Sequence, residues 1–312
     1  MIEVKNITKS YGNKKVVDNV SLNIQEGKIT SFIGPNGAGK STLLSIMSRL
    51  LKRDSGEVLL DGKDILDWDN KELAKKIAIL RQSNNINIRL TIRELVSFGR
   101  FPHSQGNLKE EDYKYIDEAI DYMQLKEFED RYLDELSGGQ RQRAYIAMVI
   151  AQNSDYIFLD EPLNNLDMKH SVEIMKTLRK LCDELNKTVV IVIHDINFAS
   201  CYSDYIVALK DGKLVKNGVT EETIQKEELE SIYEIDFHIE NINNRMDNFS
   251  TAIKNQISFN KMIESQLNQI SASVPTTNPG IPSQPEGLES ANLVDMFDAG
   301  NWSNPVNEFS TD

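Results

Sequence analysis

The sequence predicts an α/β fold organised around a phosphate-binding loop, and three observations support that prediction. Residues 34–42 read GPNGAGKST, which fits the pattern Gly, four residues, Gly-Lys-Ser/Thr. An apolar run at 29–33 precedes the loop, and apolar residues at helical spacing follow it, namely Leu43, Leu44, Ile46, Met47 and Leu50. Further apolar runs at 156–159 and 188–193 read as buried strands of the same core.

The strand–loop–helix context of this loop predicts its chemistry. Glycines let the backbone turn tightly and bring several N–H groups to one point, and the following helix presents its positive end to an anion. Lys40 would reach the β- and γ-phosphates, and the Ser41 hydroxyl would ligate Mg²⁺. The sequence therefore predicts a nucleoside triphosphate site whose loop residues are Gly34, Pro35, Asn36, Gly37, Ala38, Gly39, Lys40, Ser41 and Thr42.

The composition is that of a soluble globular protein, with 40% apolar and 27% charged residues among 312. A formal net charge of −13 argues against a broad nucleic-acid surface, because phosphate backbones require clustered Lys and Arg. Cys182 and Cys201 have no metal or redox spacing, so we expect a reducing compartment and buried apolar roles. The N-terminus shows no apolar signal core, and no apolar run approaches the ~18 residues that cross a bilayer. We expect any work at a membrane to depend on a partner.

Two residues near the loop leave alternatives open. Tyr11, in a turn-like Tyr-Gly setting, either stacks on adenine or packs half-buried. Gln82 follows a short buried strand expected at 77–80, and it either ligates a metal or caps a loop. Asp-Gly pairs at 61–62 and 211–212 predict tight turns between strands.

Helical patterns then interrupt the alternation of strands and helices. Thr91 and Glu94 have capping-box spacing, which predicts a helix from there to about residue 98, and a second helix is expected at 110–123. Ser137 and Gln140 repeat the spacing before a third apolar-periodic segment. We therefore predict a helical subdomain, about residues 84–152, inserted into the α/β core.

The start of the third helix has the features of a second anion site. Ser137 at the N-cap is followed by Gly138 and Gly139, which destabilise a helix by roughly 1 kcal/mol each relative to Ala. Such glycines indicate a backbone that something must approach closely. A helix N-terminus with bare N–H groups and a hydroxyl favours an anion.

Carboxylates and a histidine follow two of the expected strands. Asp160 ends the first, which fits the position of an Asp that holds Mg²⁺ in phosphoryl-transfer sites. Glu161 is placed to orient or deprotonate a water that attacks the γ-phosphate, the alternative being a solvated acidic turn before Pro162. His194 follows the strand at 188–193 and is either a surface histidine or a donor to the γ-phosphate.

Together these residues resemble the nucleotide-binding domain of ATP-binding-cassette (ABC) transporters over about residues 1–238. The matching motifs occur in the family's order: Tyr11 (A-loop), Gly34 to Ser41 (Walker A), Gln82 (Q-loop), Leu136 to Gln140 (the LSGGQ signature), Asp160 and Glu161 (Walker B and the catalytic Glu), Asn164 to Asp167 (D-loop) and His194 (H-switch). The resemblance implies a P-loop NTPase with a RecA-like core, an antiparallel β-subdomain and an inserted helical signature subdomain. The D-loop departs from the common Ser-Ala-Leu-Asp by reading Asn-Asn-Leu-Asp, so its dimer contacts are expected to differ in detail.

The resemblance also implies how these parts work. ATP and Mg²⁺ are the expected cofactors, with Ser41, Gln82 and Asp160 as metal ligands, and the implied catalytic residues are Lys40, Gln82, Glu161 and His194. Two copies would dimerise head to tail, so that each ATP lies between the Walker A of one copy and the other copy's Ser137, Gly138, Gly139 and Gln140. Hydrolysis would drive a membrane permease from the cytoplasmic face of the plasma membrane.

Two segments are similar to a particular group of importers. Residues 91–104 (TIRELVSFGRFPHS) resemble the ATPases of iron–siderophore, haem and cobalamin importers, which carry a Gly-Arg-x-Pro-Tyr/His element after the Q-loop. Residues 161–170 (EPLNNLDMKH) resemble siderophore-uptake ATPases of low-GC Gram-positive bacteria. We expect import of a ferric siderophore delivered by an extracytoplasmic binding protein. The alternative functions are haem or cobalamin import and a soluble non-transport ABC ATPase. The alternative interpretation of the segment itself is a packing motif that carries no information about the substrate.

The character of the chain changes from about residue 239. Apolar residues at heptad-like spacing through 239–270 predict an amphipathic helix. Residues 271–312 hold five of the chain's eight prolines and are expected to be disordered. The stretch GLESANLVDMF at 287–297 resembles gag-type segments of plant retrotransposon polyproteins. A fusion or gene-model artefact and a lineage-specific regulatory tail both remain open.

Overall fold

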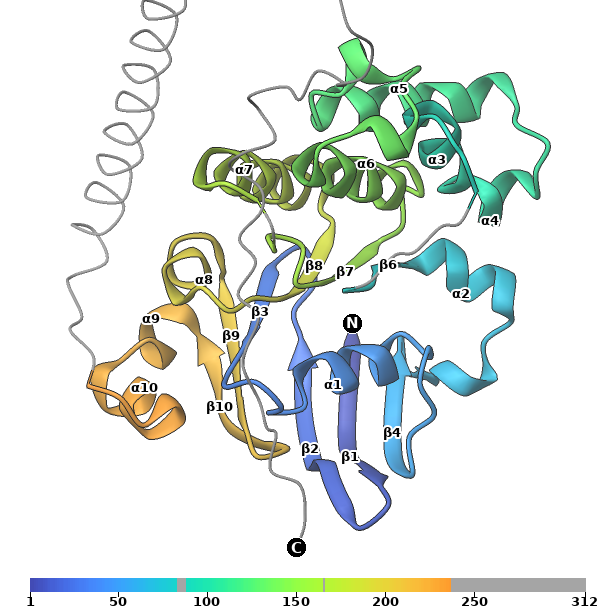
Figure 1. Cartoon of the computed structure of the whole chain (residues 1–312). Helices are drawn as coiled ribbons and strands as arrows, with labels where there is room; N and C mark the ends of the chain where they lie inside the picture. Colours follow the sequence, from blue (N-terminus) through green and yellow to red (C-terminus); the bar gives the residue numbers. More distant parts are fainter. Residues whose placement is uncertain (83–87, 165, 237–312) are drawn as a thin grey trace, which may run out of the picture. The chain divides into compact units, whose positions relative to one another are not determined.

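Two β-sheets organise the part of the chain that the computed structural model describes, residues 1–82, 88–164 and 166–236 (Figure 1). The smaller sheet is antiparallel, in the order β2-β1-β4-β5, and consists of Ile2–Tyr11 (β1), Lys14–Ile24 (β2), Ser55–Leu60 (β4) and Lys63–Asp64 (β5). The larger sheet has the order β10-β9-β3-β8-β7-β6 and consists of Ile29–Ile33 (β3), Ile77–Leu80 (β6), Tyr156–Asp160 (β7), Thr188–Val192 (β8), Tyr205–Lys210 (β9) and Lys213–Val219 (β10). The α/β class and the antiparallel β-subdomain are confirmed.

Parallel pairing in the large sheet brings the sequence motifs to one edge. Strands β6, β7, β8, β3 and β9 run parallel, and only β10 pairs antiparallel within this sheet. Every residue of β3, β7 and β8 is buried, as expected for parallel strands covered on both faces. Gly34, Gln82, Glu161 and His194 follow the carboxyl ends of β3, β6, β7 and β8. The fold therefore assembles these residues at a single sheet edge, where ligands bind in α/β proteins.

Helices cover both faces of the large sheet. Their bounds are Lys40–Met47 (α1), Asn70–Lys76 (α2), Met168–Leu185 (α7), Ile196–Tyr202 (α8), Thr220–Thr223 (α9) and Lys226–Tyr233 (α10), with single 3₁₀ turns at Ile65–Asp67, Lys126–Phe128 and Leu133–Glu135. Helix α1 lies between the two sheets and shares a core with Phe32 and Phe158, and α7 packs on the other face. Cys182 on α7 is buried as expected, whereas Cys201 on α8 is half-buried.

The helix after the phosphate-binding loop is shorter than the apolar pattern indicates. It ends at Met47, and Leu50, which continues the pattern, is 52% exposed. Arg49 has a φ of 61°, and this left-handed conformation cannot continue a right-handed helix. The guanidinium of Arg49 instead donates to the carbonyl oxygens of Ile65 and Trp68. The helix therefore ends before the last residue of the apolar pattern, and Arg49 instead contacts carbonyl groups 16 and 19 residues further along the chain.

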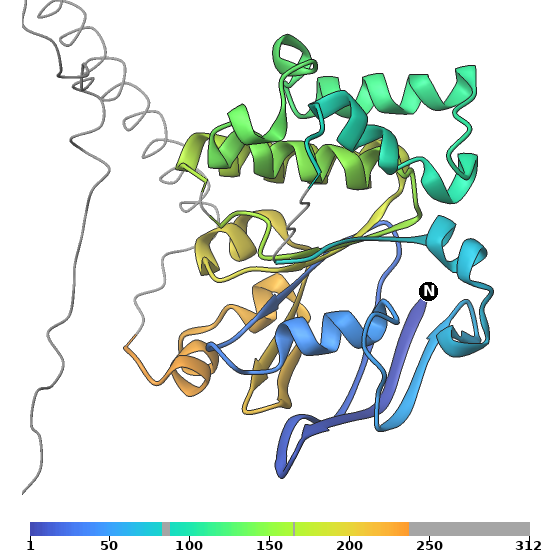
Figure 2. The same ribbon diagram turned by 45° about the vertical axis from the view of Figure 1, so that its right-hand side comes forward.

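The predicted helical insertion is present as a layer of helices beside the large sheet (teal to green in Figures 1 and 2). It comprises Ile92–Phe98 (α3), Phe101–Ser104 (α4), Glu110–Tyr122 (α5) and Gly138–Ala151 (α6). Both predicted capping boxes are formed, by Thr91 with Glu94 and by Ser137 with Gln140. The expected start of this subdomain at residue 84 lies outside the described residues, so its bounds remain a prediction.

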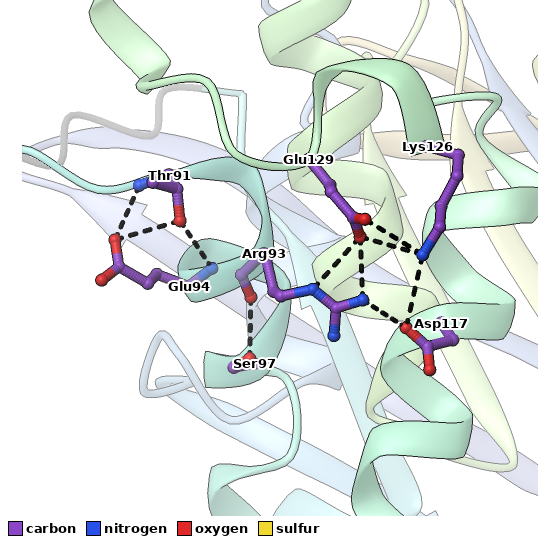
Figure 3. A network of polar contacts seen from close by, with 7 residues as sticks. All are labelled: Thr91, Arg93, Glu94, Ser97, Asp117, Lys126 and Glu129. Carbon is purple, nitrogen blue, oxygen red and sulfur yellow. Dashed lines mark hydrogen bonds and ion pairs between the residues drawn. The ribbon is translucent and has the colours of Figure 1, made fainter.

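A network of charged side chains ties α3 to α5 (Figure 3). The Arg93 guanidinium on α3 donates to Asp117 of α5 over 2.5 Å and to Glu129 over 2.8 Å. Lys126 forms ion pairs with the same two carboxylates. Ser97 Oγ donates to the Arg93 carbonyl one turn later. Asp117 and Glu129 lie outside α3, whereas the Ser97 bond stays within it, so the Arg93 side chain joins α3 to α5 and to the turn that follows α5.

The Gly99-Arg100 part of the 91–104 segment is buried and makes contacts within the protein. Arg100 is 3% exposed, and its Nε donates to Asp112 Oδ1 over 2.9 Å. Its Nη1 donates to the Ala151 carbonyl over 2.9 Å, and its guanidinium lies 4.3 Å from the ring centroid of Tyr115. A buried pair that is hydrogen-bonded in this way is costly to break from one side. Arg100 thus joins α5 and the end of α6.

Gly99 is expected to be intolerant of any side chain. A Cβ at this residue would lie 2.1 Å from the Met148 carbonyl oxygen on α6. Gly99→Ala should therefore separate α3 from α6 and lower the free energy of unfolding by about 1–3 kcal/mol, measured as a reduced Tm. Gly218→Ala is the control, because its Cβ would meet Thr223 Oγ1 at an ordinary 3.4 Å. An unchanged Tm for Gly99→Ala would contradict the close approach of the two helices.

Two expected features concern the C-terminal part of the chain. The amphipathic helix at 239–270 and the disordered tail at 271–312 both lie outside the described residues. In the part of the chain that is described, no helix is both long and apolar enough to span a membrane.

Candidate active site

The phosphate-binding loop has a backbone that only glycine can adopt at two positions. Gly34 has a φ of 138°, and a Cβ there would lie 2.0 Å from the Leu209 carbonyl oxygen. Gly39 has a φ of 98°, and a Cβ there would lie 2.4 Å from the Val16 carbonyl oxygen. The loop therefore lies tightly against β2 and β9. Its next residue, Lys40, begins α1, so the helix N-terminus points into the loop.

Lys40 holds this loop together from within. Its side chain is buried, and Nζ donates to the carbonyl oxygens of Gly34 over 2.7 Å and Pro35 over 2.9 Å. Burial lowers the pKa of Lys40, while the charges of Glu161 and Asp160 act in the opposite direction. The ammonium group thus lies at the base of the loop with two carboxylates facing it.

Ser41 and Asp160 form the oxygen pair predicted for a metal. Ser41 Oγ donates to Asp160 Oδ1 over 2.7 Å, and Asp160 is 8% exposed at the end of β7. Burial raises the pKa of Asp160, and the bond from Ser41 opposes that shift. Mg²⁺ prefers oxygen ligands and is bound through one or two protein groups together with substrate phosphates. Among the described residues no group of three or more His, Cys, Asp or Glu could hold a metal alone. The pair therefore fits a metal shared with a nucleotide.

Glu161 is held by three side chains. Its Oε1 accepts a bond from His194 Nε2 over 2.6 Å, and its Oε2 accepts from Gln82 Nε2 over 2.7 Å and from Asn164 Nδ2 over 2.6 Å. Because an ionised carboxylate only accepts, the Nε2 atom of His194 carries the hydrogen. Burial raises the pKa of Glu161, but the bond and charge of His194 and the two amide bonds outweigh it, and the pKa lies below its usual value. Glu161 is thus ionised and oriented.

Most of these residues, but not Asp160, line one pocket of about 690 Å³. Its walls come from β2, the loop, α1 and the carboxyl ends of β6, β7 and β8, and its lining residues are Val16, Asn36, Gly37, Ala38, Gly39, Lys40, Ser41, Thr42, Gln82, Glu161, Asn164 and His194. The glycine-rich loop and its lysine thus line the same cavity as a carboxylate and a histidine. Such a cavity can bind a phosphate chain and present a base to its end.

Two predicted groups lie apart from that pocket. Tyr11, which is 53% exposed, lines an adjoining pocket of about 360 Å³ together with Ser41, Thr42 and Asp160. The signature residues Ser137 to Gln140 begin α6, and they are not among the described residues that line the loop pocket of the same chain. Adenine stacking by Tyr11 and phosphate contact by the signature therefore remain predictions.

Two residues at this site, Val16 and Tyr233, belong to no sequence motif, and a third, Asn164, was placed only in the D-loop. Val16 lines the pocket but reads as an ordinary strand residue. Asn164 was visible only as the first departure in the D-loop. Tyr233 on α10 accepts a hydrogen bond from the Gly34 N–H over 2.9 Å, and no local pattern links these distant segments.

The comparisons with known proteins identify the family. The sequence matches the ABC transporter family over residues 17–164. It is 66% identical over 245 residues to the petrobactin import ATP-binding protein YclP of Bacillus subtilis (strain 168), covering 78% of this chain and 97% of that protein. The chain belongs to the ATP-binding subunits of ABC transporters. This ABC ATPase is also 42% identical over 231 residues to the iron(3+)-hydroxamate import ATP-binding protein FhuC of the same organism, covering 73% and 86%.

A solved structure agrees with this assignment. This ABC ATPase superposes with a TM-score of 0.64 and 38% identity on an ATP-binding cassette in a dimeric, post-hydrolysis state bound to ADP and Pi, covering 70% of this chain and 99% of that chain. The predicted P-loop NTPase fold and ABC resemblance are confirmed. The chain is an ATP-binding, ATP-hydrolysing subunit.

Proposed function

We propose that this ABC ATPase powers the import of a ferric siderophore through a separate integral-membrane permease. The observation that carries the proposal is the 66% identity that extends over 97% of the petrobactin import ATPase of Bacillus subtilis. The iron(3+)-hydroxamate import ATPase, at 42% identity, supports the same cargo class. Haem import, cobalamin import and a soluble role are the alternatives.

We assign a role in ATP hydrolysis to each of the residues gathered around the phosphate-binding loop. The loop N–H groups and Lys40 bind the β- and γ-phosphates, and Ser41, Gln82 and Asp160 would hold Mg²⁺, which neutralises phosphate charge when bound. Glu161 orients the attacking water and accepts its proton as the new P–O bond forms and the bond to ADP breaks. His194 fixes the Glu161 carboxylate through the Nε2–H bond to Oε1, and with nucleotide bound the same N–H group would turn toward the γ-phosphate.

A second copy would complete the site. Ser137, Gly138, Gly139 and Gln140 lie at the N-terminus of α6, outside the loop pocket of their own chain. In a head-to-tail dimer they would contact the γ-phosphate bound by the partner, and the dimeric cassette structure supports a dimer. The N-terminus of the 14-residue α6 favours such an anion.

The permease contact is assigned to the surface of the 91–104 segment. Phe98 is 51% and Phe101 58% exposed on either side of the buried Gly99 and Arg100. Large exposed aromatic side chains at one place favour a partner surface. We place the dimer on the permease at the cytoplasmic face of the membrane, where an extracytoplasmic binding protein delivers the cargo from the other side.

Complementation tests the proposed cargo. In a Bacillus subtilis strain that lacks YclP, expression of this chain is expected to restore growth and uptake of radioactive iron with ferric petrobactin as the sole iron source. The Glu161→Gln variant, expressed at the same level, should not. Restoration of haem or cobalamin uptake in matched strains, without restored siderophore uptake, would replace the proposed cargo. ATPase activity without rescue of any importer would favour the soluble role.

A further inference from the structure

Asn164 contacts the carboxylate on which hydrolysis depends. Its Nδ2 donates to Glu161 Oε2 over 2.6 Å, and Gln82 donates to the same oxygen. Asn164 also lines the loop pocket, so its amide lies at the same cavity as Lys40. Gln82 has a second assigned duty toward the metal, whereas the amide of Asn164 has none. Asn164 is therefore the donor best suited to serve the carboxylate alone.

The backbone leaves the Asn164 amide little freedom relative to Glu161. Glu161 has a φ of 52°, a conformation that few non-glycine residues adopt, and its N–H donates to the Val192 carbonyl over 3.1 Å. The Asn164 N–H donates back to the Glu161 carbonyl over 3.3 Å, which closes a turn with Pro162 at its second position. Gln142 on α6 donates to the Pro162 carbonyl over 3.1 Å. The turn is thus fixed to both β8 and α6.

We propose that Asn164 is a positioning residue that holds the Glu161 carboxylate in the orientation in which it accepts a proton from the attacking water. This inference rests on the proposed role of Glu161 as the base. The terminal torsion of a glutamate is broad, so the plane of the carboxylate is set by its hydrogen-bond donors. Asn164 is the donor with no other assigned contact, so it holds Oε2 even when Gln82 turns to the metal, and an amide can donate to the carboxylate without taking its proton.

The first test separates catalysis from nucleotide binding. Asn164→Ala should lower kcat roughly 10- to 100-fold, because a misoriented base reduces the rate, while the Kd for ATP stays unchanged. Asn164→Asp keeps the shape but replaces the donor by an acceptor, and it should lose at least as much. Asn197→Ala is a matched control, since Asn197 is exposed on α8 and does not line the pocket. An unchanged kcat for Asn164→Ala overturns the proposal.

A double-mutant cycle distinguishes positioning from general structural support. In a Glu161→Gln background, Asn164→Ala should change the single-turnover hydrolysis rate by less than about twofold, because its effect passes through the Glu161 carboxylate. An equal loss in both backgrounds would show a structural role and overturn the proposal. Normal turnover of Glu161→Gln itself would overturn the assignment of the base, and with it this inference, as a separately recognisable result.

Discussion

Glu161→Gln is expected to abolish steady-state ATP hydrolysis, with a loss of roughly 100- to 10,000-fold, while ATP still binds. The amide has the same shape as the carboxylate but cannot accept the proton of the attacking water. The loop and Lys40, which hold the phosphates, are not changed by this substitution. Phosphate release measured under steady-state conditions, together with the Kd for ATP, checks both parts.

Two control experiments accompany this prediction. Glu184→Gln removes the same charge from an exposed position on α7, where Glu184 pairs with Lys180, and it should leave turnover unchanged. Thermal unfolding of Glu161→Gln with and without ATP shows whether bound nucleotide still stabilises the fold. Normal turnover in Glu161→Gln would contradict the role assigned to this residue.

The elements that could be predicted from the sequence are those with strong local signals. Strand β3 agrees at both ends because the segment Ile29–Ile33 is bounded by Lys28 and by Gly34, which begins the glycine-rich loop. Helices α3 and α6 begin after Thr91 and Ser137 because each capping box satisfies N–H groups with side chains only three residues apart. By contrast, the apolar pattern that runs on to Leu50 does not mark where α1 ends, since Arg49 contacts carbonyl groups 16 and 19 residues further along the chain.

The parts of the site that could not be predicted depend on contacts over long distances in the sequence or on backbone conformation. No residue pattern indicates that Glu161 has a positive φ, and the contact of Asn164 with its carboxylate follows from that turn. The hydrogen bond between Gly34 and Tyr233 joins nearly opposite ends of the described chain. From the sequence, only the family resemblance indicated that Gln82 and His194 lie near Glu161. The structure explains why they meet, because these residues follow the parallel strands β6, β7 and β8 at one sheet edge.

Lys40→Ala is expected to abolish ATP binding, with a loss of affinity of roughly 100-fold or more. Charge-assisted hydrogen bonds to a phosphate contribute about 1.5–3 kcal/mol each, and Lys40 is placed to make more than one. The substitution also removes the donor to the Gly34 and Pro35 carbonyls, so the loop loses its internal support. Equilibrium binding of ATP, with hydrolysis as the second readout, checks the prediction.

Lys187→Ala is a matched control for this loss. Lys187 also has a pKa that burial lowers, and its Nζ donates to a backbone carbonyl, that of Asn153, over 3.1 Å. It follows α7 and does not line the loop pocket, so its removal should reduce stability without changing ATP affinity. Tight ATP binding retained by Lys40→Ala would contradict the phosphate-binding role. If Lys40→Ala loses ATP binding while Glu161→Gln keeps it, then ATP binding depends on the α1 side of the pocket and hydrolysis depends on the residue that follows β7.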